Sequence, residues 1–222
     1  NRCEKGEGKK DIHRDLPNLY EYKLHRLFDY KPLGAKEAPR GNVAIPRVLN
    51  MYEDYPFWFT FFTKMGYRVV LSPMSSKELY EKGIDTISSD TACYPAKMVH
   101  GHIKTLVDMG EKWIFYPCIN YEQKEDPEAP NHYNCPIVAT YPEVIANNMD
   151  EVFRENHVEF THDFLPYDDD KRLAERLYEL LRARGEIVVK ADVRTAVEAA
   201  RKEQEAFKKD VEAEGRRAIE YA

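Results

Sequence analysis

The chain has 222 residues, of which 43% are hydrophobic and 12% aromatic, and its formal net charge is -6. This length and apolar content are enough for one large domain, or two small ones, with a buried core. An acidic chain lacks the basic face that nucleic-acid binding requires. It also contains no run of about eighteen apolar residues, so no membrane span is predicted.

The number and spacing of the cysteines indicate in which cellular compartment the protein works. The chain has four, at long and unequal intervals, which is not the spacing of a secreted disulfide framework. No signal peptide is recognisable. We therefore expect a cytoplasmic protein whose thiols serve metal or redox chemistry. Because the first residue is Asn1 and not Met, we expect the chain to be a piece of a longer protein.

The first elements follow from composition and apolar pattern. Residues 1–40 are predicted to be an irregular leading segment with a short helix at about 17–30. A buried strand at 43–45 comes next, followed by a loop that carries Arg47, Asn50, Glu53 and Asp54. A nearly all-apolar helix is expected to begin at Tyr55 and to end at Gly66.

The rest of the chain alternates between strand and helix patterns. Strands are predicted at 67–71, 113–116, 136–139 and 158–161, and helices at 75–82, 91–109, 141–149, 168–184 and 192–221. This alternation predicts an α/β lobe with a mostly parallel sheet of four to five strands, similar to flavodoxin or Rossmann folds. We expect a leading segment at 1–40, the lobe at 41–190, and a long charged helix at 191–222. That helix has one apolar seam, an expected interruption at Gly215, and leads to a second lobe outside the chain.

Three of the cysteines lie beside prolines at the ends of predicted elements. Cys93 is near the start of helix 91–109, where unpaired N–H groups and the nearby Lys97 favour a thiolate. Cys118 directly follows strand 113–116, at the edge where open α/β sheets bind ligands. Cys135 precedes the predicted strand 136–139, which puts it on the far side unless the acidic loop 120–134 folds back.

These positions favour a shared site over ordinary packing. A single free cysteine is most often a buried packing residue. Three at element ends instead indicate a site assembled from separate loops, with His132 as a possible fourth donor. The paired short spacing of a zinc ribbon is missing, so an iron–sulfur cluster is favoured over zinc.

Other polar residues are weaker candidates. His100 and His102 are two positions apart on one helix, so they face different directions and a structural role is favoured for both. Arg47 could contact an anion such as a CoA phosphate, and Glu53 or Asp54 could relay protons, although an ordinary solvated loop explains them equally well. Phosphate-loop and dinucleotide fingerprints are missing, so no ATP site is predicted in this chain.

Four segments carry a family resemblance: residues 44–54 (AIPRVLNMYED), 93–102 (CYPAKMVHGH), 116–118 (YPC) and 131–136 (NHYNCP). Together they resemble the uncharacterised domain of large CoA-enzyme activase-like proteins, which are related to the activators of 2-hydroxyacyl-CoA dehydratases. The resemblance implies one lobe of a dehydratase-like region that works with actin–Hsp70-type ATPase domains and a second lobe, both outside this chain.

The resemblance also implies a cofactor. In the dehydratases, a cysteine at a helix start and another after a strand hold a 4Fe-4S cluster, and Cys93 and Cys118 match these positions. Cys135 has no secure counterpart, and Cys3 is a reserve ligand. The implied function is to accept electrons from the ATP-driven partner for a reductive reaction, with an acyl-CoA as the implied substrate class. Two alternatives remain: a non-catalytic docking or scaffold module, and a zinc-stabilised domain.

Overall fold

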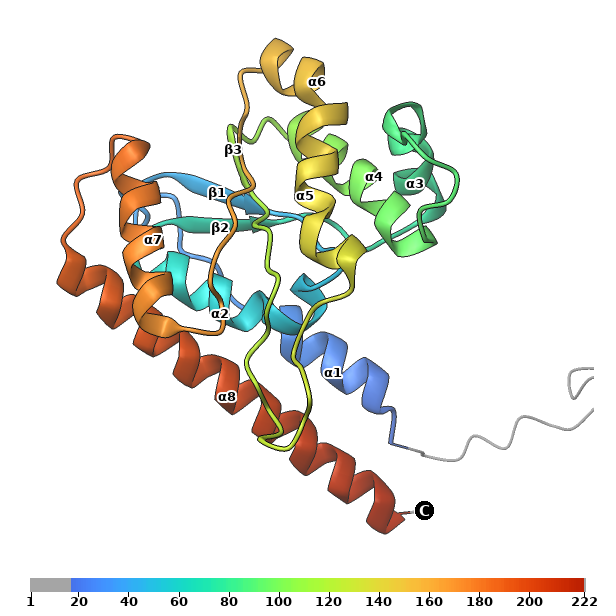
Figure 1. Ribbon diagram of the computed structural model, residues 1–222, viewed down its shortest axis with the longest axis vertical. Coiled ribbons are helices and arrows are strands. Elements are labelled where there is room, and N and C mark those ends of the chain that lie inside the picture. Colours follow the sequence, from blue (N-terminus) through green and yellow to red (C-terminus); the bar gives the residue numbers. More distant parts are fainter. Residues whose placement is uncertain (1–16, 222) are drawn as a thin grey trace, which may run out of the picture.

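The computed structural model describes residues 17–221 (Figure 1). The helices are α1 (Leu19–Phe28), α2 (Met51–Lys64), α3 (Lys77–Gly83), a 3-10 turn (Ile84–Thr86), α4 (Tyr94–Asp108), α5 (Pro136–Asn148), α6 (Asp150–Glu155), α7 (Asp170–Ala183) and α8 (Lys190–Tyr221). The strands are β1 (Asn42–Ile45), β2 (Arg68–Leu71), β3 (Trp113–Phe115) and β4 (Glu159–Thr161). Within the described residues, no helix is both long and apolar enough to cross a membrane.

The four strands form one parallel sheet in the order β2-β1-β3-β4. Ala44 of β1 pairs with Ile114 of β3, and Trp113 of β3 pairs with Glu159 of β4. The chain leaves β1 toward β2 on one side and later returns to β3 on the other side. This reversal next to β1 is the arrangement at which open α/β sheets bind ligands, and it confirms the expected fold class.

Helices cover the sheet in two groups (Figure 1). One group contains α1, α2, α7 and α8, in which α8 runs along the other three. The second group contains α3, α4, α5 and α6, and its neighbours in sequence contact one another. Because parallel strands are joined by crossover connections, α2, α4 and α5 all begin at the carboxyl edge of the sheet.

Aromatic side chains fill the space between α2 and the sheet. The rings of Trp58 and Phe62 on α2 each lie 4.8 Å, centroid to centroid, from Phe115 of β3. Phe62 also meets Trp113 edge-on at 5.4 Å. A helix that is apolar nearly all round must be buried on most sides, and α8 and α1 complete that burial for α2.

Helices α3 and α4 approach each other so closely that their backbones touch. A Cβ placed on Gly101 would lie 1.9 Å from the Leu79 carbonyl oxygen, and one placed on Gly83 would lie 2.3 Å from the Gly101 nitrogen. Glycine is therefore required at both positions because the two backbones are in direct contact there.

Two predicted boundaries are wrong. Residues 136–139 are not a strand but the first turn of α5, in which the Ala139 amide bonds the Cys135 carbonyl at 2.9 Å. Pro136 suits the first helical position, and a short apolar run does not by itself distinguish a strand from a buried helix start. Helix α2 begins at Met51 rather than Tyr55, so Glu53 and Asp54 lie on its first turn and Pro56 lies inside it.

Helix α8 is continuous through Gly215, contrary to the expected interruption. Its predicted apolar seam is buried at Val193, Val197, Ala200 and Phe207 and half-buried at Val211, and Ala196 adds to it. Gln204 is the buried polar residue within this seam, with 1% of its surface exposed. Residue Cys3 lies outside the described residues.

Candidate functional site at the carboxyl edge of the sheet

The residues that follow β1 and β3 define the candidate site. After β1 the chain passes through Pro46 and Arg47 into the start of α2, and after β3 it passes through Pro117 to Cys118. Cys118 still pairs with Phe164 through an isolated parallel bridge, so the sheet hydrogen bonding extends to it. Leu49 has a φ of 41°, a left-handed conformation that is uncommon for a branched residue. Such strain is typical of functional loops.

A cavity of about 520 Å³ opens at this edge, and we call it the Arg47 cavity. It is bounded by α1, the loop after β1, the start of α3 and the start of α4. Its lining residues are Tyr20, Arg47, Val48, Leu49, Tyr52, Ser75, Ser76, Lys77, Tyr94, Pro95 and Met98. The lining combines apolar side chains with two cations, Arg47 and Lys77. This chemistry suits a ligand with an apolar part and an anionic part.

Arg47 is held in place from two sides. Its guanidinium carbon lies 4.4 Å from the centre of the Phe28 ring, and its Nε donates to the Ser72 carbonyl at 3.3 Å. Within residues 17–221, no carboxylate forms an ion pair with it. Burial lowers the pKa of Arg47 from its ordinary value, yet an arginine remains charged at neutral pH. Arg47 is thus a half-buried, oriented cation with no anionic partner in the described fold.

Cys93 and Cys135 occupy equivalent positions on neighbouring helices. Cys93 is the N-cap of α4, Cys135 is the N-cap of α5, and both thiols are exposed. Helices α4 and α5 are in contact and lie side by side in Figure 1. The placement of Cys93 at a helix start is as predicted, whereas Cys135 lies at this same edge because it begins a helix and not a strand. Lys97 bonds the Asp90 carbonyl at 2.8 Å and holds the loop before α4.

Cys118 has a different environment. Its side chain is fully buried, and burial raises the pKa of its thiol to about 12. It lies against the middle of α5, close enough for the Glu143 backbone to influence that pKa. Cys135 is eight residues before Glu143, which corresponds to about 12 Å along a helix axis. This separation explains why Cys118 and Cys135 do not converge.

No group of three or more His, Cys, Asp or Glu side chains in residues 17–221 is arranged to hold a metal ion. The expected trio of cysteines is therefore not gathered into one centre by this lobe. His132 is not beside the thiols either. Its Nδ1 donates to the Glu122 carbonyl at 2.8 Å, and its ring packs against Tyr121. The two exposed thiols lie at an open edge and are accessible to a group from outside the chain, whereas Cys118 is buried in this conformation.

His100 joins α4 to its neighbours. Thr86 donates its hydroxyl to the Gly83 carbonyl at 2.9 Å, so His100 Nδ1 donates to the Thr86 oxygen at 2.8 Å. His100 Nε2 then accepts from the Tyr141 hydroxyl at 3.1 Å. Burial lowers the pKa of His100 to about 4, so the ring is neutral at pH 7. Both nitrogens are engaged, and the role that this geometry supports is to connect α3, α4 and α5.

His102 links two serines below the Arg47 cavity. The buried Ser72 hydroxyl accepts from the Arg47 amide at 2.7 Å and lies 2.7 Å from His102 Nδ1. Because its own proton has no other acceptor in the described residues, Ser72 donates to Nδ1, and Nε2 donates to Ser75 at 3.0 Å. Burial lowers the pKa of His102 to about 4. In this tautomer the Ser75 oxygen accepts a hydrogen bond from His102, so His102 cannot take the Ser75 proton and does not activate Ser75 as a nucleophile. As predicted, the two histidines face different partners.

The family model of the CoA enzyme activase uncharacterised domain (DUF2229) matches residues 42–222. The chain belongs to this family. No significant match was found among curated proteins or among solved structures. The DUF2229 match begins at the first residue of β1 and so contains the sheet, both exposed N-cap cysteines and Arg47. Helix α1, which contributes Tyr20 to the Arg47 cavity, precedes the matched region.

The sequence indicates Asp54 as a possible proton relay, but not its place in a buried group of residues of this DUF2229 domain. Asn50, Asp54 and Glu122 line a second cavity of about 540 Å³, which we call the hairpin cavity, on the far side of the α2 start. Glu53 lines it too, and pairs with Lys23 at 2.5 Å rather than facing the Arg47 cavity. The signal in the sequence is the pair Glu53 and Asp54 directly before the apolar part of α2. Both residues lie on the first turn of this helix, where Asp54 is on its buried face.

Proposed function

We propose that this DUF2229 domain is one lobe of an electron-accepting CoA enzyme system, and that its carboxyl edge provides half of an iron–sulfur site. The observation that carries the proposal is the pair of exposed thiols, Cys93 and Cys135, that cap neighbouring helices at the same edge. A helix N-terminus stabilises a thiolate, which is the form that binds iron. The other ligands would come from a second dehydratase-like lobe.

In this proposal the residues of the chain have separate tasks. Cys93 and Cys135 hold the cluster, which when bound would supply one-electron chemistry at the edge of the sheet. Arg47, the unpaired cation of the Arg47 cavity, binds the anionic part of an acyl-CoA substrate. An ATPase activase partner delivers the electrons, in the cytoplasm.

The experiment is metal analysis of protein prepared without oxygen, together with the second lobe. Iron and sulfide in stoichiometric amounts, with absorption near 400 nm, are expected for the wild type. Cys93→Ala and Cys135→Ala should lose the iron, while Cys118→Ala should retain it because its thiol is buried. Zinc in place of iron would contradict the proposal, as would a metal-free protein that still supports the electron transfer. Iron loss in Cys118→Ala would overturn the exposed-pair assignment in favour of a ligand role for all three cysteines.

A further inference from the structure

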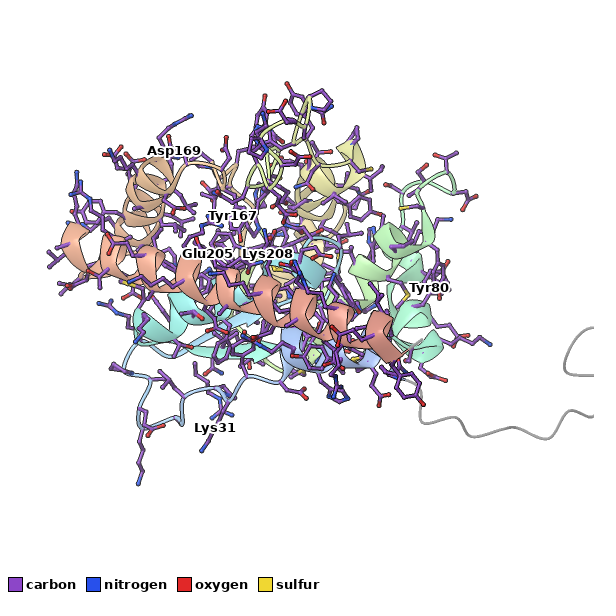
Figure 2. The ribbon with its side chains drawn as sticks, turned by 90° about the horizontal axis from the view of Figure 1, so that it is seen from below. Lys31, Tyr80, Tyr167, Asp169, Glu205 and Lys208 are labelled. Carbon is purple, nitrogen blue, oxygen red and sulfur yellow. The ribbon has the colours of Figure 1, made fainter. Side chains whose placement is uncertain are left out.

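The hairpin cavity lies between three elements that are distant in sequence. The first turn of α2 supplies Asn50, Glu53 and Asp54. The segment 122–134, which forms a hairpin closed by the bridge between Tyr121 and Tyr133, supplies most of the remaining lining. Helix α8 supplies Lys208, whose ammonium pairs with Glu125 at 2.5 Å. Figure 2, which looks onto α8, labels Lys208 and Tyr167.

Two polar side chains in this cavity are buried without hydrogen-bond partners in the described structure. Asn50 is 6% exposed, and neither its Nδ2 nor its Oδ1 has a partner. Asp54 is 3% exposed, and its Oδ2 has no donor in hydrogen-bond geometry, although the Tyr167 hydroxyl lies near enough to lower the pKa of this carboxyl. Buried polar atoms are nearly always hydrogen-bonded, so unpaired atoms that line a cavity indicate a partner from outside the chain. Both residues lie on a helical turn whose backbone is fixed, so they are held in position.

Glu122 completes the set of acceptors. Its Oε1 accepts from Asn134 at 2.6 Å, and in the described structure Oε2 has no recorded donor. Burial raises the pKa of both Asp54 and Glu122. Glu122 adds to the rise for Asp54, Glu53 adds to the rise for Glu122, and Lys208 and Arg201 offset part of the rise for both carboxyl groups. A positive ligand between the two carboxylates would lower the free-energy cost of burying each of them in its charged form.

The charge of the lining also favours a cation. Five acidic side chains line the cavity, namely Glu53, Asp54, Glu122, Glu125 and Asp126, against the two cations Lys124 and Lys208. Lys23 and Lys208 already neutralise Glu53 and Glu125. A metal ion is disfavoured because no three carboxylate, His or Cys groups converge in residues 17–221, and because Asn50 Nδ2 is a donor.

We propose that the hairpin cavity binds a small aliphatic primary amine, whose ammonium group donates to Asn50 Oδ1, Asp54 and Glu122. An ammonium has three donors and no acceptor, which matches the buried Asn50 Oδ1 and Asp54 Oδ2 together with the half-buried Glu122 Oε2. Asn50 Nδ2 then donates to an acceptor elsewhere on the ligand, or to a water molecule where the ligand carries none. The cavity of about 540 Å³ exceeds one ammonium group and leaves room for a short chain. This site is separate from the cysteine edge and does not depend on the proposed iron–sulfur function.

Calorimetric titration with 1,4-diaminobutane tests the proposal, with 1,4-butanediol as a probe of equal length and no charge. Saturable binding of the diamine and none of the diol is expected. Asp54→Asn and Glu122→Gln keep the side-chain shape and should weaken diamine binding about tenfold or more, because a charge-assisted hydrogen bond is lost. Glu128→Gln, an exposed change in the same hairpin, should bind like the wild type.

Several results would overturn the amine site. These are equal binding of diamine and diol, unchanged affinity in both Asp54→Asn and Glu122→Gln, or displacement of the diamine by stoichiometric Mg²⁺ or Ca²⁺. Absence of saturable diamine binding to the wild-type chain would do the same. The comparison of diamine with diol uses the wild type alone, so it decides the question even where a variant fails to fold.

Discussion

Gln204 of α8 bonds Phe57 of α2 across the main interface of the molecule. Its Oε1 accepts from the Phe57 amide at 3.2 Å, while its Nε2 donates to the Glu53 carbonyl at 2.7 Å. These are the two backbone groups that an undistorted helix would pair with each other. Pro56, which lies between them, offers no N–H group of its own and disturbs this turn. A side chain from another helix therefore completes the hydrogen bonding of α2.

Replacing Gln204 by Ala should destabilise the fold markedly. The change leaves a buried N–H and a buried carbonyl without the side-chain partner, which costs about 1–3 kcal/mol. Urea unfolding followed by circular dichroism measures this loss. Glu205→Ala, at the exposed neighbouring position on α8, is the control and should change the free energy of unfolding by less than about 0.5 kcal/mol. Equal stability of the two variants would refute the bridging role.

Two glycine substitutions should have opposite effects. Gly101→Ala places a Cβ 1.9 Å from the Leu79 carbonyl, so α3 and α4 must separate, at a cost of about 3 kcal/mol or more. Gly215→Ala on α8 meets no described atom within 4 Å and should stabilise the helix by about 0.5–1 kcal/mol. Thermal melts of both variants check this pair, and a stable Gly101→Ala protein would contradict the close α3–α4 contact.

The described thiols should differ in reactivity. Cys93 and Cys135 are exposed, whereas Cys118 is buried with a pKa of about 12. Alkylation of the native protein should label the two exposed cysteines at least roughly a hundredfold faster than Cys118, because only a thiolate in contact with solvent reacts. Peptide mapping by mass spectrometry measures the rates, with denatured protein as the control. Rapid labelling of Cys118 in the native state would show that α5 opens.

Asp54 should make the fold less stable as the pH rises. Burial, and then Glu122, raises the folded-state pKa of Asp54 above its ordinary value, so the folded state binds this proton more tightly than the unfolded state. Its effect on stability is neutral well below pH ~4 and becomes unfavourable as the pH rises from there through the raised pKa. Asp54→Asn should therefore gain stability over the wild type with increasing pH. A difference that stays constant from pH 4 to pH 8 would contradict the raised pKa.

The two buried histidines should make the fold less stable as the pH falls, which is opposite to the effect of Asp54. Burial lowers the pKa of His100 and His102 from 6.5 to about 4. Each therefore contributes full stability above pH ~6.5 and loses it as the pH falls toward 4, by up to about 3 kcal/mol. His100→Gln keeps a donor and an acceptor and should weaken this acid dependence. Unfolding free energies between pH 4 and pH 7 measure it, and identical pH profiles for both proteins would disprove it.

Much of the architecture is predictable from local pattern, and the exceptions have physical reasons. Helix starts with a clear cap, such as Ser76 and the Asp169 cap of α7, agree with the expected boundaries. The segment from Pro136 to Ala139 is one exception, because four apolar residues fit either a strand or a buried first turn. In the fold, β4 takes the place beside β3, and residues 136–139 begin the crossover helix α5 that leads to it.

The sequence predicts which residues of the candidate site lie at helix and strand ends, but not which of their side chains are buried. The start of α4 at Cys93 follows from local sequence, and so does the strand end near Cys118. The burial of Cys118 depends on α5, and the burial of Asp54 depends on α8 and the hairpin, which are distant in sequence. Long-range packing of this kind leaves no local signal, so the two carboxyl groups resembled solvated loop residues.

The hairpin that begins after Cys118 returns to the chain at Cys135, while Glu125 near its tip is tied to Lys208 on α8. One loop thus has its two ends beside two thiols and its tip on the longest helix. Because the contact at the tip is a solvent-exposed ion pair that contributes at most about 1 kcal/mol, the loop can part from α8 at little cost while hydrogen bonds hold its two ends together.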